Sequence, residues 1–169
     1  MDTNNTLKSK VNEIVAKLRN SGEDKPDPNE AFNMLDHKGD MIYLLGEVLA
    51  NDVDLDKQYR MNKVILSAMR KNLVSCVQEI TETGLLEALL KVALPSGLGF
   101  DITTDSEIPE EQFLFENNGS AAVVTVSIEK DEDLVHFLFD NKIAVMTLGH
   151  VTKGDIRIDD TSYGNIREI

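Results

Sequence analysis

The stretch of residues 73–102 constrains the fold of this chain more than any other. It contains a β-rich apolar segment (73–80), a polar turn that ends at Gly84, an apolar helical segment (85–94), and a second short strand (98–102). The free N–H groups at the start of such a helix, together with the helix dipole, favour an anion. The pattern therefore predicts either an anion site at the turn or a strand–helix unit with a purely structural role.

The candidate site residues surround this turn: Glu79, Thr81, Glu82, Thr83 and Gly84. As a ligand site, the turn would hold a phosphate group at the start of the helix. Glu79 and Glu82 could also act as a general acid or base. The structural alternative is that these acidic residues only cap the helix, where carboxylates are common.

The composition excludes several classes of protein. A net charge of −13 disfavours nucleic acid or an anionic membrane as a partner of the whole surface. No apolar run approaches the ~20 residues that a membrane helix needs, and the polar first residues do not resemble a signal peptide. The single cysteine, Cys76, excludes an internal disulfide, so we expect a reducing cytoplasm.

The order of predicted elements indicates an α/β (α+β) sandwich in which helices cover a mixed β-sheet. Residues 5–20 have helical periodicity, and the following charged segment contains Pro26 and Pro28. We therefore divide the chain into an N-terminal helix with its linker (1–28) and one domain (29–169). The apolar stripe of the N-terminal helix packs either on its own domain or on a partner.

The remaining elements follow from local patterns. We expect a central strand at 41–45, helices at 57–72 and from 131, and a strand at 120–128, with Ile128 and Phe139 on buried faces. Lys153 and Gly154 give a hairpin signal between strands 144–151 and 155–159. The polar tail, residues 160–169, is predicted to be loose.

Other chemically active residues give weaker signals. Cys76 lies in an apolar run, which favours a buried, inert thiol over a nucleophile. His37, His136 and His150 are far apart in the sequence, and none has a second histidine at helical metal-binding spacing, so no metal site is predicted. The helix at 57–72 carries a basic stripe, which indicates either a phosphate-contacting face or a solvated face.

Several hydrophobic segments resemble the C-terminal domain of the small-subunit type of phosphoribosylformylglycinamidine synthase, in the superfamily related to aminoimidazole ribonucleotide synthase. Residues 38–47 are similar to the family pattern Pro-Gly-Asp-x-Ile-Tyr-Leu-Leu-Gly-Glu, and residues 97–102 to Gly-Leu-Gly-Phe-Asp-Ile. Residues 148–160 look like its closing hairpin. The resemblance covers roughly residues 29–166 in the same order, and it implies the same fold.

The polar motifs of that family are much less well kept. Where the family has His-Asp-Val-Ser-Asp-Gly-Gly-Leu, residues 78–85 match only at Gly84 and Leu85, and Thr83 replaces the first glycine. Where the family has Phe-Gly-Glu-x-x-Gly-Arg, the charged pair is replaced by Asn117 and Ala121. This loss of polar positions within a surviving hydrophobic frame is the pattern of a domain kept for its shape.

The resemblance implies a role in purine biosynthesis and leaves three hypotheses open. In the first, the domain has a structural, assembly or pseudo-site role within a synthase complex. In the second, it contributes a nucleotide or substrate phosphate pocket to a working ATP-dependent amidotransferase and is completed by another chain. In the third, it is a sibling with another kinase-like or cyclo-ligase activity.

The resemblance also implies cofactors and partners. ATP or ADP with Mg²⁺ are the cofactors of the family, although we expect this chain alone to bind none of them firmly and to be inactive as a ligase. The expected partners are further copies of the chain or other synthase domains and subunits, with a nucleotide as a further candidate ligand.

Overall fold

A mixed seven-stranded sheet forms the centre of the computed structural model, which describes residues 3–27, 31–48, 54–117 and 120–169. The strand order is β2-β4-β1-β5-β3-β6-β7, and the β3–β6 pair is parallel while the other neighbours are antiparallel. The strands are β1 (Met41–Gly46), β2 (Cys76–Glu79), β3 (Gly99–Ile102), β4 (Ala121–Val126), β5 (Val145–Thr152), β6 (Asp155–Ile158) and β7 (Thr161–Asn165). The helices are α1 (Thr3–Asn20), α2 (Leu55–Arg70), α3 (Leu85–Ser96), α4 (Glu110–Phe115), the 3₁₀ turn η1 (Ile128–Lys130) and α5 (Asp131–Asp140).

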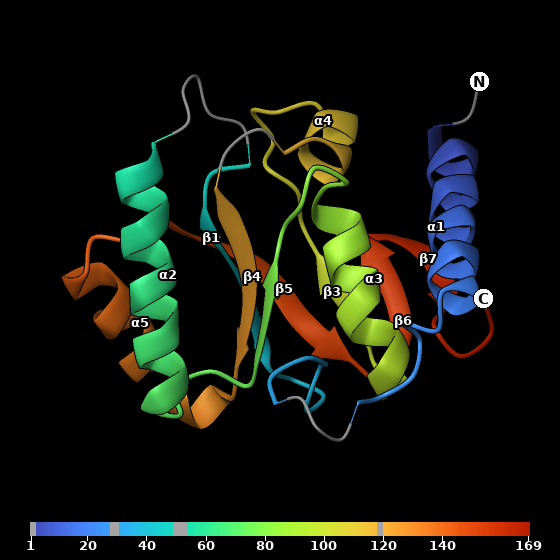
Figure 1. Cartoon of the computed structure of the whole chain (residues 1–169). Helices are drawn as coiled ribbons and strands as arrows, with labels where there is room; N and C mark the ends of the chain where they lie inside the picture. Colours follow the sequence, from blue (N-terminus) through green and yellow to red (C-terminus); the bar gives the residue numbers. More distant parts are fainter. Residues whose placement is uncertain (1–2, 28–30, 49–53, 118–119) are drawn as a thin grey trace.

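Helices lie on both sides of the sheet and produce two apolar cores (Figure 1). Alternate residues of β1 point to opposite faces, so Ile42 and Leu44 join the core under α1 and α3, while Tyr43 and Leu45 join the core under α2 and α5. This continuous burial is what a strand between two helical layers requires. The predicted α/β class with a mixed, helix-covered sheet is confirmed, as is the central position of this strand.

The second helical layer covers only part of the sheet. On β5, the side chains of Val145, Thr147 and His150 are exposed on the face away from α3. Further along the same sheet, Arg157 Nε of β6 lies 3.6 Å from Asp101 Oδ2 of β3, and both side chains are partly exposed. None of the described helices packs on this part of the face.

Helix α1 packs on its own domain, which is one of the two alternatives that its apolar stripe left open. Leu7, Val11, Val15 and Leu18 are buried in the same core as α3. Lys17 Nζ also lies 2.6 Å from Glu87 Oε1 of α3, which adds an ion pair to the apolar contact. The proposed boundary between residues 28 and 29 lies outside the described residues, so the division into two parts stays a prediction.

The predicted hairpin between the last two long strands is wrong, because β3 lies between β5 and β6. The connecting turn passes over the start of β3, where a Cβ on Gly99 would be 2.2 Å from the Asp155 carbonyl oxygen. Only a glycine leaves room for this crossing. A short Lys-Gly turn predicts that the chain reverses direction, but it does not predict that the two strands pair with each other. Here β3 pairs with both of them and separates them.

Three further expectations are corrected. The tail is ordered, because β7 pairs with β6 and buries Tyr163 and Ile166. Ile128 is 71% exposed, since the chain leaves the sheet after Val126 and enters η1. Phe139 is 79% exposed, because the short helix α5 buries only the stripe that contains Leu134 and Leu138. In the described part of the chain, no helix is both long and apolar enough to cross a membrane.

Candidate functional site

The turn between β2 and α3 is built as the sequence predicts. β2 ends at Glu79, and the Gly84 N–H closes the turn by donating to the Thr81 carbonyl oxygen at 3.0 Å. Gly84 is the residue before α3 and has a φ of 99°, a conformation that favours glycine. The hydroxyl oxygens of Thr81 and Thr83 lie 2.7 Å apart and are hydrogen-bonded to each other.

The structure brings the five predicted site residues to this single turn but divides them by exposure. Glu79, Thr81, Glu82 and Thr83 are exposed, whereas Gly84 is buried. A Cβ on Gly84 would lie 2.6 Å from the Leu114 carbonyl oxygen and 2.7 Å from the Phe115 Cα. The end of α4 therefore covers Gly84, as the neighbouring positions of α3 and α4 in Figure 1 also show.

A carboxylate already occupies the first turn of α3. Burial raises the pKa of Glu87, but the hydrogen bonds from Lys17 and Thr83 outweigh it, so the pKa is below its ordinary value. This residue also places a negative charge near the positive end of the helix dipole. A phosphate approaching this helix would meet that charge, together with those of Glu79 and Glu82.

Asn117 holds the backbone of this turn, a role that no local sequence pattern indicates. Its side-chain N–H group donates to the carbonyl oxygens of Ile80, at 2.8 Å, and Thr81, at 3.3 Å. Its Oδ1 atom is buried and has no hydrogen-bond partner among the described residues. In the sequence, this residue stands where the family has a glutamate. In the structure, its side chain fixes the backbone of the turn. Residues 118–119 lie outside the described residues.

A pocket of about 350 Å³ lies beside the turn, between α2 and the edge of the sheet formed by β2 and β4. Its walls are mostly apolar, with Met61 and Ile65 on one side and Val77 and Ala122 on the other. Glu79 is the predicted site residue that lines it. No local sequence pattern could identify this pocket, because its walls come from three separate segments.

The weaker candidates behave as ordinary structural or surface groups. Cys76 is buried, and burial followed by the charges of Asp36 and Asp40 raises the pKa of its thiol to about 12, which fits the inert interpretation. The basic stripe of α2 is exposed, and Lys63 Nζ lies 4.7 Å from the ring centre of Tyr59 in the same helix. Helix α2 also contains an acidic residue, Asp56, because it begins earlier than predicted.

Two curated relatives are similar to most of this chain but are much longer proteins. The phosphoribosylformylglycinamidine synthase subunit PurL of Caldanaerobacter subterraneus subsp. tengcongensis is 27% identical over 107 residues, which cover 63% of this chain and 15% of the relative. The PurL subunit of Carboxydothermus hydrogenoformans is 26% identical over 137 residues, which cover 70% of this chain and 19% of the relative. The chain thus spans less than a fifth of either relative.

Solved structures show the same fold at low sequence identity. Phosphoribosylformylglycinamidine synthase II from Thermotoga maritima superposes with a TM-score of 0.69 at 12% identity, covering 81% of this chain and 27% of that one. PurL of T. maritima complexed with ATP gives 0.68 at 12% identity, with 81% and 26% coverage. PurLQS from T. maritima gives 0.65 at 13% identity, with 75% and 24% coverage.

The sequence pattern of one domain family covers most of the chain. The family described as "AIR synthase related protein, C-terminal domain" matches residues 22–160. This range includes the central strand β1, the β2–α3 turn and the strands β3 to β6. The chain therefore belongs to the AIR synthase related protein, C-terminal domain family.

Proposed function

We propose that this domain has a non-catalytic, assembly role in a phosphoribosylformylglycinamidine synthase complex of cytoplasmic purine biosynthesis. The observation that carries the proposal is the state of the β2–α3 turn, where a phosphate would bind. Gly84 is covered by the backbone of residues 114–115, and the first turn of α3 contains the Glu87 carboxylate. The domain keeps the family fold, but its own backbone and the Glu87 carboxylate occupy the space at the start of α3 where an anion would bind.

The charges at the turn support this proposal. Glu79 and Glu82 are exposed beside it. The nearby cations act on Glu87: Lys17 Nζ lies 2.6 Å from Glu87 Oε1, and the charge of Lys91 also lowers the pKa of this carboxyl. A phosphate site normally offers N–H groups together with a Lys, an Arg or a bound Mg²⁺. Among the described residues, no Lys or Arg other than Lys17 forms a hydrogen bond or ion pair with residues 79–87.

The second candidate function is a nucleotide or substrate phosphate pocket that another chain completes. Two observations favour it: the pocket of about 350 Å³ that Glu79 lines, and the buried Asn117 Oδ1 atom that lacks a partner in the described structure. In this version, Mg²⁺ bound by Glu79 and Glu82 would offset the negative charge. The nucleotide would be ATP or ADP, each of which is present in a solved complex of T. maritima PurL.

Isothermal titration with ADP-Mg²⁺ and with formylglycinamide ribonucleotide separates the two candidates. The assembly role predicts no binding tighter than about 1 mM, which corresponds to about −4 kcal/mol. Micromolar binding that is lost in the double variant Glu79→Gln, Glu82→Gln, and kept in Glu129→Gln, would overturn it in favour of the pocket. Glu129 is a suitable control because it is an exposed carboxylate in η1, away from the turn.

The assembly role also requires a partner, either a second copy of the chain or another synthase subunit. Light scattering after size-exclusion chromatography, over a hundredfold range of protein concentration, would detect self-association. The same measurement with the other synthase subunits of the source organism would detect a mixed complex. A chain that stays monomeric in both experiments would contradict the proposal.

A further inference from the structure

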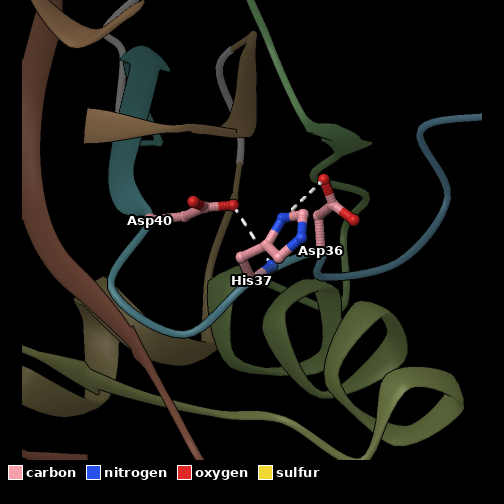
Figure 2. Close-up of side chains that lie close together, drawn as sticks. All are labelled: Asp36, His37 and Asp40. Carbon is pink, nitrogen blue, oxygen red and sulfur yellow. Dashed lines mark hydrogen bonds and ion pairs between the residues drawn. The ribbon is translucent and has the colours of Figure 1, made fainter. Parts of the chain in front are cut away.

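The turn before β1 brings together three side chains with metal-binding atoms, and nothing in the predicted site involves them. Asp36 Oδ2 lies 3.0 Å from His37 Nδ1, and Asp40 Oδ2 accepts a hydrogen bond from the His37 backbone N–H at 3.3 Å (Figure 2). One ligand atom from each of the three residues lies within 4.8 Å of the other two. This turn precedes β1, so it lies at the opposite end of the sheet from the β2–α3 turn.

The backbone of this turn is fixed before any ion binds. The Gly39 N–H donates to the Val151 carbonyl oxygen, and the Val151 N–H donates to the Asp40 carbonyl oxygen, both at 2.8 Å. The Asp40 N–H donates to the His37 carbonyl oxygen at 3.2 Å and closes the turn. Gly39 adopts a φ of 92°, which permits this sharp reversal. Hydrogen bonds to β5 therefore hold the backbone that carries the three side chains.

Asp40 is the buried member of this cluster. The residue is only 3% exposed. In the described residues no Lys or Arg forms a salt bridge with it. A buried carboxylate is costly unless a cation compensates it.

A second buried polar residue, Thr125, lies on β4, the strand beside β1. The Thr125 side chain is fully buried, and its hydroxyl has no hydrogen-bond partner in the described part of the chain. The strand register sets Thr125 between Ile42 of β1, two residues after Asp40, and Cys76 of β2. A buried hydroxyl without a protein partner is commonly satisfied by a bound water or ion.

We propose that Asp36, His37 and Asp40 bind a divalent first-row transition-metal ion, with Zn²⁺ as the ion of choice. One imidazole nitrogen and two carboxylates form a donor set that Zn²⁺ accepts, and a three-residue set leaves a position for water. Metal–ligand distances of about 2.0–2.2 Å require the ligand atoms to approach one another by roughly 1 Å. The exposed side chains of Asp36 and His37 can make this movement. Because the ion binds the folded turn, it stabilises the fold.

The test is a titration of the full chain, stripped with a chelator, with Zn²⁺ alone, followed by calorimetry and by thermal unfolding. We expect one site of micromolar affinity and a rise in the unfolding temperature. His37→Gln and Asp36→Asn should each weaken the site at least tenfold and remove that rise. His136→Gln should change the affinity less than twofold. It is a stringent control, because His136 is an exposed histidine on α5 with Glu132 and Asp140 one helical turn away.

The variants keep the result interpretable. Asp36 and His37 are exposed, so their replacement should leave unfolding in the presence of chelator unchanged, whereas Asp40→Asn alters a buried group. The proposal would be overturned if the wild type and His37→Gln bound Zn²⁺ with equal affinity. It would also be overturned if calorimetry detected no heat up to about 1 mM Zn²⁺, a dissociation constant that corresponds to a binding free energy of about −4 kcal/mol. The outcome is independent of the nucleotide titration, since the two sites share no residue.

Discussion

Gly84, at the start of α3, lies directly against the backbone of Phe115, at the end of α4. A Cβ on Gly84 would stand 2.7 Å from the Phe115 Cα, a separation that real Cβ atoms do not reach. This glycine is also one of two residues that match the family motif at the turn. Its presence is explained by a contact within the chain, so it is not evidence of a bound phosphate.

Gly84→Ala should destabilise the domain by about 3 kcal/mol, from positive-φ strain together with the clash against residues 114–115. The matched control is Gly22→Ala. Gly22 has a φ of 80°, but a Cβ added there would meet no atom within 4 Å, so only the backbone strain of about 1 kcal/mol remains. Urea unfolding of both variants measures the difference. If both variants lost the same free energy of unfolding, the contact with Phe115 would contribute nothing to stability.

Glu110→Gln should change the pH dependence of stability. A hydrogen bond with Asp159, then burial and the Asp159 charge, raise the pKa of Glu110 from 4.5 to about 7. Between these values the folded state binds one more proton than the unfolded chain, so stability falls as pH rises from about 4.5 to about 7. Because the pair is partly exposed, we expect a loss of about 1 kcal/mol for the wild type.

The measurement is urea unfolding at several pH values between 5 and 8. Glu110→Gln should flatten the curve and be the more stable protein at pH 8, since a neutral amide can still donate to Asp159. Asp159 itself is held in place by Thr104, whose N–H and hydroxyl each donate to it at 2.7 Å. The control variant is Glu107→Gln, at an exposed residue of the loop that contains Thr104. Its stability should have the same pH dependence as that of the wild type. If the stability of the wild type did not change between these pH values, the raised pKa of Glu110 would be refuted.

Cys76 should not react with a thiol reagent while the domain is folded. Its side chain is buried, and burial together with the charges of Asp36 and Asp40 raises the thiol pKa to about 12. At pH 8 the thiolate fraction is therefore about 10⁻⁴. Absorbance with a chromogenic disulfide should show less than a tenth of one thiol per chain in buffer and one thiol in urea. Rapid reaction in buffer would reverse the inert assignment.

Tyr163→Ala should cost about 3 kcal/mol, because it removes a buried ring from β7 and leaves a cavity. Ser162→Ala, on the exposed side of the same strand, should stay within about 0.5 kcal/mol of the wild type. Both values come from urea unfolding. If the two variants were equally stable, the last residues would be loose, as the sequence alone indicated.

The local elements could be predicted because each depends on neighbouring residues. The apolar run at 41–45 forms the central strand, and the helical spacing of Leu7, Val11, Val15 and Leu18 forms the buried stripe of α1. The β2–α3 turn was found for the same reason, since Glu79 to Gly84 are consecutive. Periodicity reports which face of an element is apolar, and burial of that face is the main driving force for its position.

The sequence by itself thus determined the element types, the class of fold and the turn that collects the five predicted site residues. Only the tertiary structure decided that β3 separates β5 from β6, that Asn117 fixes the turn at Ile80, and that Lys17 meets Glu87. The physical reason is that these contacts join segments far apart in the chain. Which segments meet depends on how the apolar faces of helices and sheet pack, and on which polar groups at the edges still need a hydrogen-bond partner. No local sequence pattern contains this information.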